Sequence, residues 1–142
     1  MYRVLMPVDE DTERAVAQAR YVADLPDASD AVEVFILYVF ADEDSLEPSN
    51  DEQARQPEDI GSIARVVELL DTHDITSRTR KDRGDPAEAI LSQTDELEPD
   101  TIVLGGRKRS PAGKILFGSV TMDVLRHTDI PVVVAGQASL GD

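Results

Sequence analysis

Residues 101–135 read TIVLGGRKRSPAGKILFGSVTMDVLRHTDIPVVVA, and this stretch carries the clearest indication of the fold class. It begins with an apolar run that stops at two glycines, as expected of a buried strand. A basic loop follows, and from Ser119 onward Val120, Val124 and Leu125 share one face of a helix. The stretch ends in a second apolar run, PVVVA. Two buried strands joined by a helix predict a parallel pair in a sheet that is covered on both faces.

The rest of the chain repeats this alternation of strands and helices. Asp85 followed by Pro86 is typical of a helix N-terminus. The order predicts an α/β fold with an open, Rossmann-like, five-stranded parallel sheet and helices on both faces. We expect one domain over residues 1–142, with a flexible acidic loop at about 41–57. Strands are expected at 2–7, 32–40, 75–80, 101–106 and 131–136, and helices at about 12–25, around 63–70, after Asp85 and from Ser119.

The chain is strongly acidic. Its 142 residues include 29 acidic and 14 basic ones, which gives a formal net charge of −15. An acidic surface repels phosphate backbones, so we expect no nucleic-acid partner. The acidic residues are spread along the chain and lysine is scarce, which we interpret as adaptation to a salt-rich, halophilic cytoplasm. A basic protein partner is the alternative interpretation of the same charge.

Composition also excludes several classes of function. The absence of cysteine excludes disulfides, thiol catalysis and cysteine-based metal sites. No apolar run is long enough for a membrane span, and we expect no membrane partner. Because Met1 is followed directly by the first expected strand, we predict no signal peptide and a cytoplasmic location. His73 and His127 fall at the ends of expected helices, where they complement the helix dipole rather than catalyse.

The glycine-rich loop at 105–121 is not a P-loop, although it contains a Gly-Lys pair. Gly106 lies seven positions before Gly113, where the P-loop motif requires five. Ile115 occupies the position of the magnesium-binding hydroxyl. The G-x-G-x-x-G dinucleotide fingerprint is absent from this loop as well. Both common phosphate loops are therefore excluded.

The sequence is still compatible with a different kind of anion site, at the start of the last expected helix. Gly118 and Ser119 open a helix, and the free N–H groups of a helix N-terminus suit a phosphate. The Ser119 and Thr121 hydroxyls can add hydrogen bonds, and the basic run at 107–109 can neutralise charge. Ligands of open parallel sheets bind at the carboxyl ends of the strands, where PVDED and GGRKRS are expected. The alternative is an ordinary helix start beside a solvated basic loop.

Three separated motifs resemble the universal stress protein family. GGRKRSPAGKILFGSVTMDVLRHTDIPVVVA (105–135) resembles its C-terminal signature, G-x2-G-x9-G-[ST], followed by a helix and the last strand. VLMPVDEDTERA (4–15) is similar to its first strand and turn, and GDPAEAIL (84–91) to the start of its third helix. The resemblance covers nearly the whole chain in the family's order. It implies an α/β fold that binds adenine nucleotides and dimerises, often by pairing of the last strands.

For this chain the resemblance implies ATP as the ligand, with Mg²⁺ where the nucleotide carries it. Asp9 would bond at or near the adenine, and the amides and hydroxyls that follow Gly118 would hold the phosphates. Lys108 stands where the signature has its second glycine, so its ammonium either obstructs the backbone approach or replaces the lost contact by charge. The residues implied to contact nucleotide are Pro7, Val8, Asp9, Val39, Leu104, Gly105, Arg107, Lys108, Gly118, Ser119, Val120 and Thr121.

The resulting expectation is an ATP-binding homodimer with a regulatory or protective role in stress, rather than a dedicated enzyme. The last strand, 131–135, carries no charge that would discourage edge pairing, so we expect the dimer to form through it. An unidentified protein partner is also expected. Two alternatives stay open: a dimeric interaction module of the same fold that binds no nucleotide, which Lys108 would favour, and a slow ATPase.

Overall fold

The computed structural model describes residues 1–41, 56–106 and 117–136. Most of the expected acidic loop at 41–57, together with Arg107 and Lys108, lies outside these residues. The strands are β1 (Tyr2–Pro7), β2 (Val32–Phe40), β3 (Thr76–Arg83), β4 (Thr101–Gly105) and β5 (Val132–Ala135). The helices are α1 (Thr12–Ala23), α2 (Ala28–Ala31), α4 (Gly61–Thr72), α5 (Pro86–Leu97) and α6 (Ser119–His127), with a 3₁₀ turn, η2 (Pro57–Asp59).

The strands form one five-stranded parallel sheet in the order β3-β2-β1-β4-β5. This confirms the predicted fold class. The chain runs outward from β1 through β2 to β3, and then returns to place β4 and β5 on the other side of β1. The direction of winding therefore reverses between β1 and β4, and such a reversal leaves room for a ligand beyond the carboxyl ends of the two strands.

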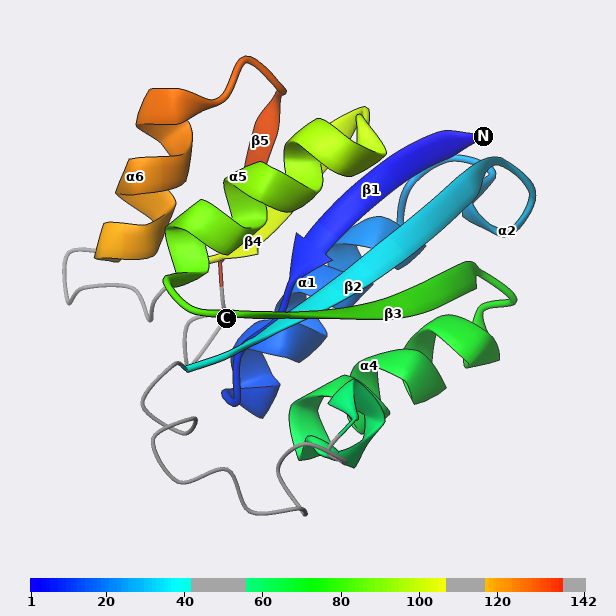
Figure 1. Ribbon diagram of the computed structural model, residues 1–142. Coiled ribbons are helices and arrows are strands. Elements are labelled where there is room, and N and C mark those ends of the chain that lie inside the picture. Colours follow the sequence, from blue (N-terminus) through cyan, green and yellow to red (C-terminus); the bar gives the residue numbers. More distant parts are fainter. Residues whose placement is uncertain (42–55, 107–116, 137–142) are drawn as a thin grey trace, which may run out of the picture.

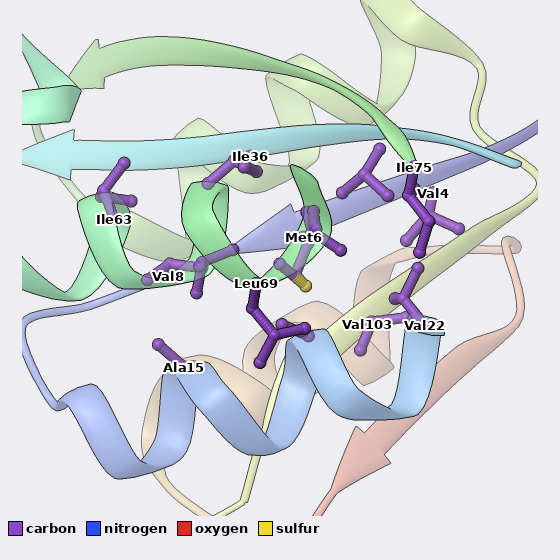
Figure 2. Packing of buried hydrophobic residues seen from close by; sticks show 14 of the residues in the cluster. Val4, Met6, Val8, Ala15, Val22, Ile36, Ile63, Leu69, Ile75 and Val103 are labelled. Atoms are coloured by element: carbon purple, nitrogen blue, oxygen red, sulfur yellow. The ribbon is translucent and has the colours of Figure 1, made fainter. Parts of the chain in front are cut away.

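Helices cover both faces of the sheet, with α1 and α4 on one face and α5 and α6 on the other (Figure 1). Figure 2 shows the first layer, where Met6 and Ile36 of the sheet pack with Val22 of α1 and Leu69 of α4. The second layer contains Leu5, Leu37, Ile90, Leu104 and Val124. Successive residues of a strand point to opposite faces, so β1 contributes Leu5 to one core and Met6 to the other.

The structure departs from the expected elements in three places. The short helix α2 and the turn η2 were not predicted, because four and three residues are too few for a periodic pattern. β3 continues to Arg83 instead of ending at residue 80. Its polar end is held by α5: Arg80 Nε donates to Gln93 Oε1 at 2.7 Å, and Gln93 Nε2 donates to Asp82 Oδ2 at 3.1 Å.

The histidines lie at helix ends, as predicted. Nδ1 of His73 is 2.9 Å from the Leu69 carbonyl at the end of α4. Nδ1 of His127 is 2.7 Å from the Asp123 carbonyl at the end of α6. These contacts place both imidazoles against carbonyls of the last helical turns, where a histidine side chain complements the helix dipole. Within the described ranges, no helix is long and apolar enough to cross a bilayer.

Candidate functional site

A pocket of about 530 Å³ opens at the carboxyl edge of the sheet, where β1 and β4 diverge. It is lined by the ends of β1, β2 and β4 and by the beginnings of α1, α5 and α6. The structure brings ten of the predicted contact residues to this pocket, and they are Pro7, Val8, Asp9, Val39, Leu104, Gly105, Gly118, Ser119, Val120 and Thr121. Arg107 and Lys108 lie outside the described residues.

The turn between β1 and α1 holds Asp9 in one position. The Asp9 carboxylate accepts from the Asp11 N–H at 2.9 Å and pairs with the Arg14 guanidinium. The backbone carbonyl of Asp9 accepts from the Ser62 hydroxyl of α4 at 2.5 Å. Beside it, the Tyr38 hydroxyl donates to the Glu10 carboxylate at 2.9 Å. Asp9 is therefore fixed from both its side chain and its backbone before any ligand arrives.

Gln18 bridges β1 and β4 by hydrogen bonds at the point where the two strands separate. The register of these strands pairs Val4 with Thr101 and Leu5 with Ile102, and the pairing ends there. Beyond it, Gln18 Nε2 donates to the Pro7 carbonyl at 2.6 Å and to the Val103 carbonyl at 3.0 Å. Gln18 is 1% exposed, so both bonds are made by a buried side chain. The side chain thereby satisfies one carbonyl on each strand that no longer has a ladder partner.

Gly105 makes room for a protein side chain. A Cβ on Gly105 would lie 2.5 Å from Arg14 Cδ and closer still to Arg14 Cγ. It would also lie 3.1 Å from Gln18 Oε1. The family resemblance implied Gly105 as a nucleotide contact; the residue lines the pocket, and the stem of Arg14 occupies the space that a Cβ would fill.

Three helices begin at the pocket, and among the described residues only one of them lacks a side-chain cap at its N-terminus. Asp11 caps α1 by accepting from the Arg14 N–H, and Asp85 caps α5 by accepting from the Glu88 N–H, both at 3.0 Å. Gly118 precedes α6 and offers no side chain to cap it. α4 also begins without a side-chain cap, but none of its residues lines the pocket. The N-terminus of α6 is thus the one positioned to receive an anion in the pocket.

Thr121 adds a polar group at the same end of α6. The residue is 6% exposed and lines the pocket. Within the part of the chain that the structure describes, its hydroxyl forms no hydrogen bond. The first intrahelical bond of α6 runs from the Met122 N–H to the Gly118 carbonyl at 3.1 Å, so the N–H groups before Met122 also have no helical partner. A buried free hydroxyl beside free amides is an arrangement that an anionic ligand would satisfy.

Sequence analysis missed several lining residues, of which Arg14 and Gln18 matter most. Glu10 and Asp11 belong to the PVDED segment expected at the strand ends but were not named as contacts, and the others are Arg14, Gln18, Leu37, Tyr38, Pro86 and Ile90. A signal for Gln18 was present, since it falls on the apolar face of α1 formed by Ala15, Ala19 and Val22. A polar residue within an apolar face is expected to have a buried partner. Arg14 precedes Gln18 by one helical turn, but nothing in the sequence indicated that it would contact Gly105.

Comparison with known proteins agrees with this architecture. Residues 1–136 match the universal stress protein family. The stress response protein NhaX of Bacillus subtilis (strain 168) is 39% identical over 51 residues, a match that spans 36% of this chain and 31% of that relative. A universal stress protein from Archaeoglobus fulgidus has a TM-score of 0.72 at 24% identity, covering 94% of this chain and 98% of its own. A universal stress protein family protein from Arabidopsis thaliana with AMP bound has a TM-score of 0.69 at 15% identity, covering 97% and 93%.

The two solved structures share the fold of this chain at low sequence identity. The family match covers 136 of the 142 residues, and it includes every strand and helix that lines the pocket. The chain belongs to the universal stress protein family.

Proposed function

We propose that the chain binds ATP in the pocket between β1 and β4 and acts as a nucleotide-dependent regulatory or protective protein. One observation carries the proposal: the N-terminus of α6 and the buried hydroxyl of Thr121 both lie at the pocket, and no side chain of the described residues caps the helix or bonds to the hydroxyl. Amides and hydroxyls without partners at a helix N-terminus suit phosphate oxygens. The relative from Arabidopsis thaliana with AMP bound supports an adenine nucleotide as the ligand class.

The lining residues indicate where each part of the nucleotide would lie. Phosphates would lie against Gly118, Ser119 and Thr121, where the helix dipole is positive. The base would lie at the ends of β1 and β2, beside Val8 and Val39. Among the described residues, no cluster of three acidic or histidine side chains is arranged to hold a metal. Any Mg²⁺ would therefore arrive with the nucleotide.

Isothermal titration calorimetry with ATP, with and without Mg²⁺ and in molar KCl, tests the proposal. We expect saturable binding with one site per chain. The Asp9 carboxylate already accepts from Asp11 and pairs with Arg14, so it is poorly placed as a base for water, and ATP should be recovered intact. Mg²⁺-dependent ADP production would instead indicate a slow ATPase. No binding at millimolar ATP would leave the chain as an interaction module.

We also propose that the protein is a homodimer formed through β5. The sheet order places β5 at an edge, and Val132, Val133 and Val134 carry no charge that would oppose pairing. The opposite edge, β3, differs because it carries Arg78, Arg80, Lys81 and Arg83. Pairing of β5 with its copy across a two-fold axis would cover the uncharged edge.

Replacing Val134 with proline should convert this dimer to a monomer. The carbonyls of Pro131 and Ala135 bond to β4, so by alternation the N–H of Val134 points away from β4, toward the edge. Proline there removes one outward donor and leaves the β4–β5 bonds in place. Light scattering after size-exclusion chromatography would measure the change. Val134→Thr retains the N–H and should remain dimeric, whereas an equally dimeric Val134→Pro would contradict pairing through β5.

A further inference from the structure

The described part of the pocket wall is acidic and contains a single cation. Its charged lining residues are Asp9, Glu10, Asp11 and Arg14. Three carboxylates and one guanidinium leave these lining residues with a net negative charge, which repels a ligand that carries several negative charges. Among the lining residues that the structure describes, Arg14 is therefore the one that can offset this charge.

Arg14 is held at the pocket by contacts with four residues, Gly105, Gly106, Asp9 and Asp11. Its stem occupies the space above Gly105 that a Cβ would fill. Its Nε donates to the Gly106 carbonyl at 3.3 Å. Its Nη1 forms an ion pair with the carboxylate of Asp9. Its Nη2 lies 3.7 Å from Oδ2 of Asp11. The side chain is 24% exposed, so the guanidinium is only partly screened by water.

We propose that Arg14, whose stem lies over Gly105, makes the affinity of this acidic pocket increase with the negative charge of the ligand. A guanidinium has five N–H donors, and the hydrogen bonds to Gly106 and Asp9 use two of them. Arg14 offsets the charge of Asp9 and Asp11, and it retains donors that can reach an anionic group of the ligand. This inference rests on the proposed nucleotide site and assigns it a specificity-determining residue. Gly105 contributes to the site by leaving the space that the stem of Arg14 occupies.

A ligand series separates this role from a purely structural one. Adenosine, AMP and ATP share the base and sugar but differ in charge, so each would be titrated into the wild type and into Arg14→Gln. We expect Arg14→Gln to weaken ATP binding by about tenfold or more, AMP binding by less, and adenosine binding by less than about twofold. Arg14→Lys keeps the charge without the planar fork and should recover part of the loss.

Arg20→Gln is the matched control, because it removes one positive charge from the exposed face of the same helix, away from the pocket. It should change the affinity for all three ligands by less than about twofold. Equal losses for adenosine and ATP in Arg14→Gln, or no loss for either, would overturn the inference while leaving the proposed function intact. A wild type that binds none of the three ligands would overturn both.

A double-mutant cycle tests whether Gly105 is required because its lack of a Cβ leaves room for the stem of Arg14. Gly105→Ala should weaken ATP binding about as much as Arg14→Ala, because its Cβ displaces the arginine stem. In the Arg14→Ala background the same Gly105→Ala change should cost almost nothing further. If Gly105→Ala weakened ATP binding equally in both backgrounds, the glycine would be reserving space for the ligand itself, and the proposed role of Gly105 in leaving room for Arg14 would be wrong.

Discussion

Replacing Gly118 with aspartate should weaken ATP binding by at least about a hundredfold while leaving the fold as stable as the wild type. The φ of Gly118 is −84° and its ψ is 173°, an extended conformation that any residue adopts. Aspartate is a favourable N-cap, so α6 should gain a few tenths of a kcal/mol. The same carboxylate would occupy the free amides of α6 and repel the phosphates. Calorimetry with ATP and thermal unfolding would measure the two effects.

Gly118→Asn is the matched control for charge. Its amide oxygen can accept the same capping bond, but it carries no negative charge. We expect about a tenfold loss of ATP affinity or less, because only competition for a backbone amide remains. The difference between the aspartate and asparagine variants is therefore the electrostatic contribution at this helix end. Equal affinities for ATP in the two variants would contradict phosphate binding at α6.

Replacing Gln18 with methionine should lower the free energy of unfolding by about 3 kcal/mol. Methionine has nearly the same shape, so the packing of α1 is preserved and only the two donated bonds are lost. The carbonyls of Pro7 and Val103 would then be buried without a partner. For a chain of this length the loss corresponds to a melting temperature lower by roughly 10 °C. Denaturant unfolding and calorimetry would both report it.

Gln93→Met provides the comparison at the outer edge of the sheet. Gln93 also makes two bonds, but its partners Arg80 and Asp82 lie on the edge strand β3. The Arg80 side chain is 30% exposed, so water can replace part of what Gln93 supplies. We expect a loss of about 1 kcal/mol in the free energy of unfolding. If Gln18→Met lowered the free energy of unfolding no more than Gln93→Met, the two bonds of Gln18 would not be stabilising the junction of β1 and β4 as described.

Most elements of the fold could be predicted from the sequence because their signals are local. The apolar run of β2 and the Asp85-Pro86 start of α5 were both found where the structure has them. The turn at Asp9 and the start of α6 at Gly118 were recognised in the same way, and the structure places both at one pocket. The extension of β3 to Arg83 was not predictable, since its polar end is paired with β2, a strand more than forty positions earlier in the chain.

The sequence by itself determined the order of strands and helices, the parallel sheet and the glycine-serine start of α6, because each follows from neighbouring residues. Only the tertiary structure decided which side chains occupy the gap between β1 and β4. Gln18 bonds to Val103, 85 positions away, and Arg14 bonds to Gly106, 92 positions away. Contacts at such separations depend on how α1 packs against the reversal of the sheet, which no local pattern encodes. For the same reason the contact between Gly105 and the stem of Arg14 could not be predicted, although Gly105 itself lines the pocket as expected.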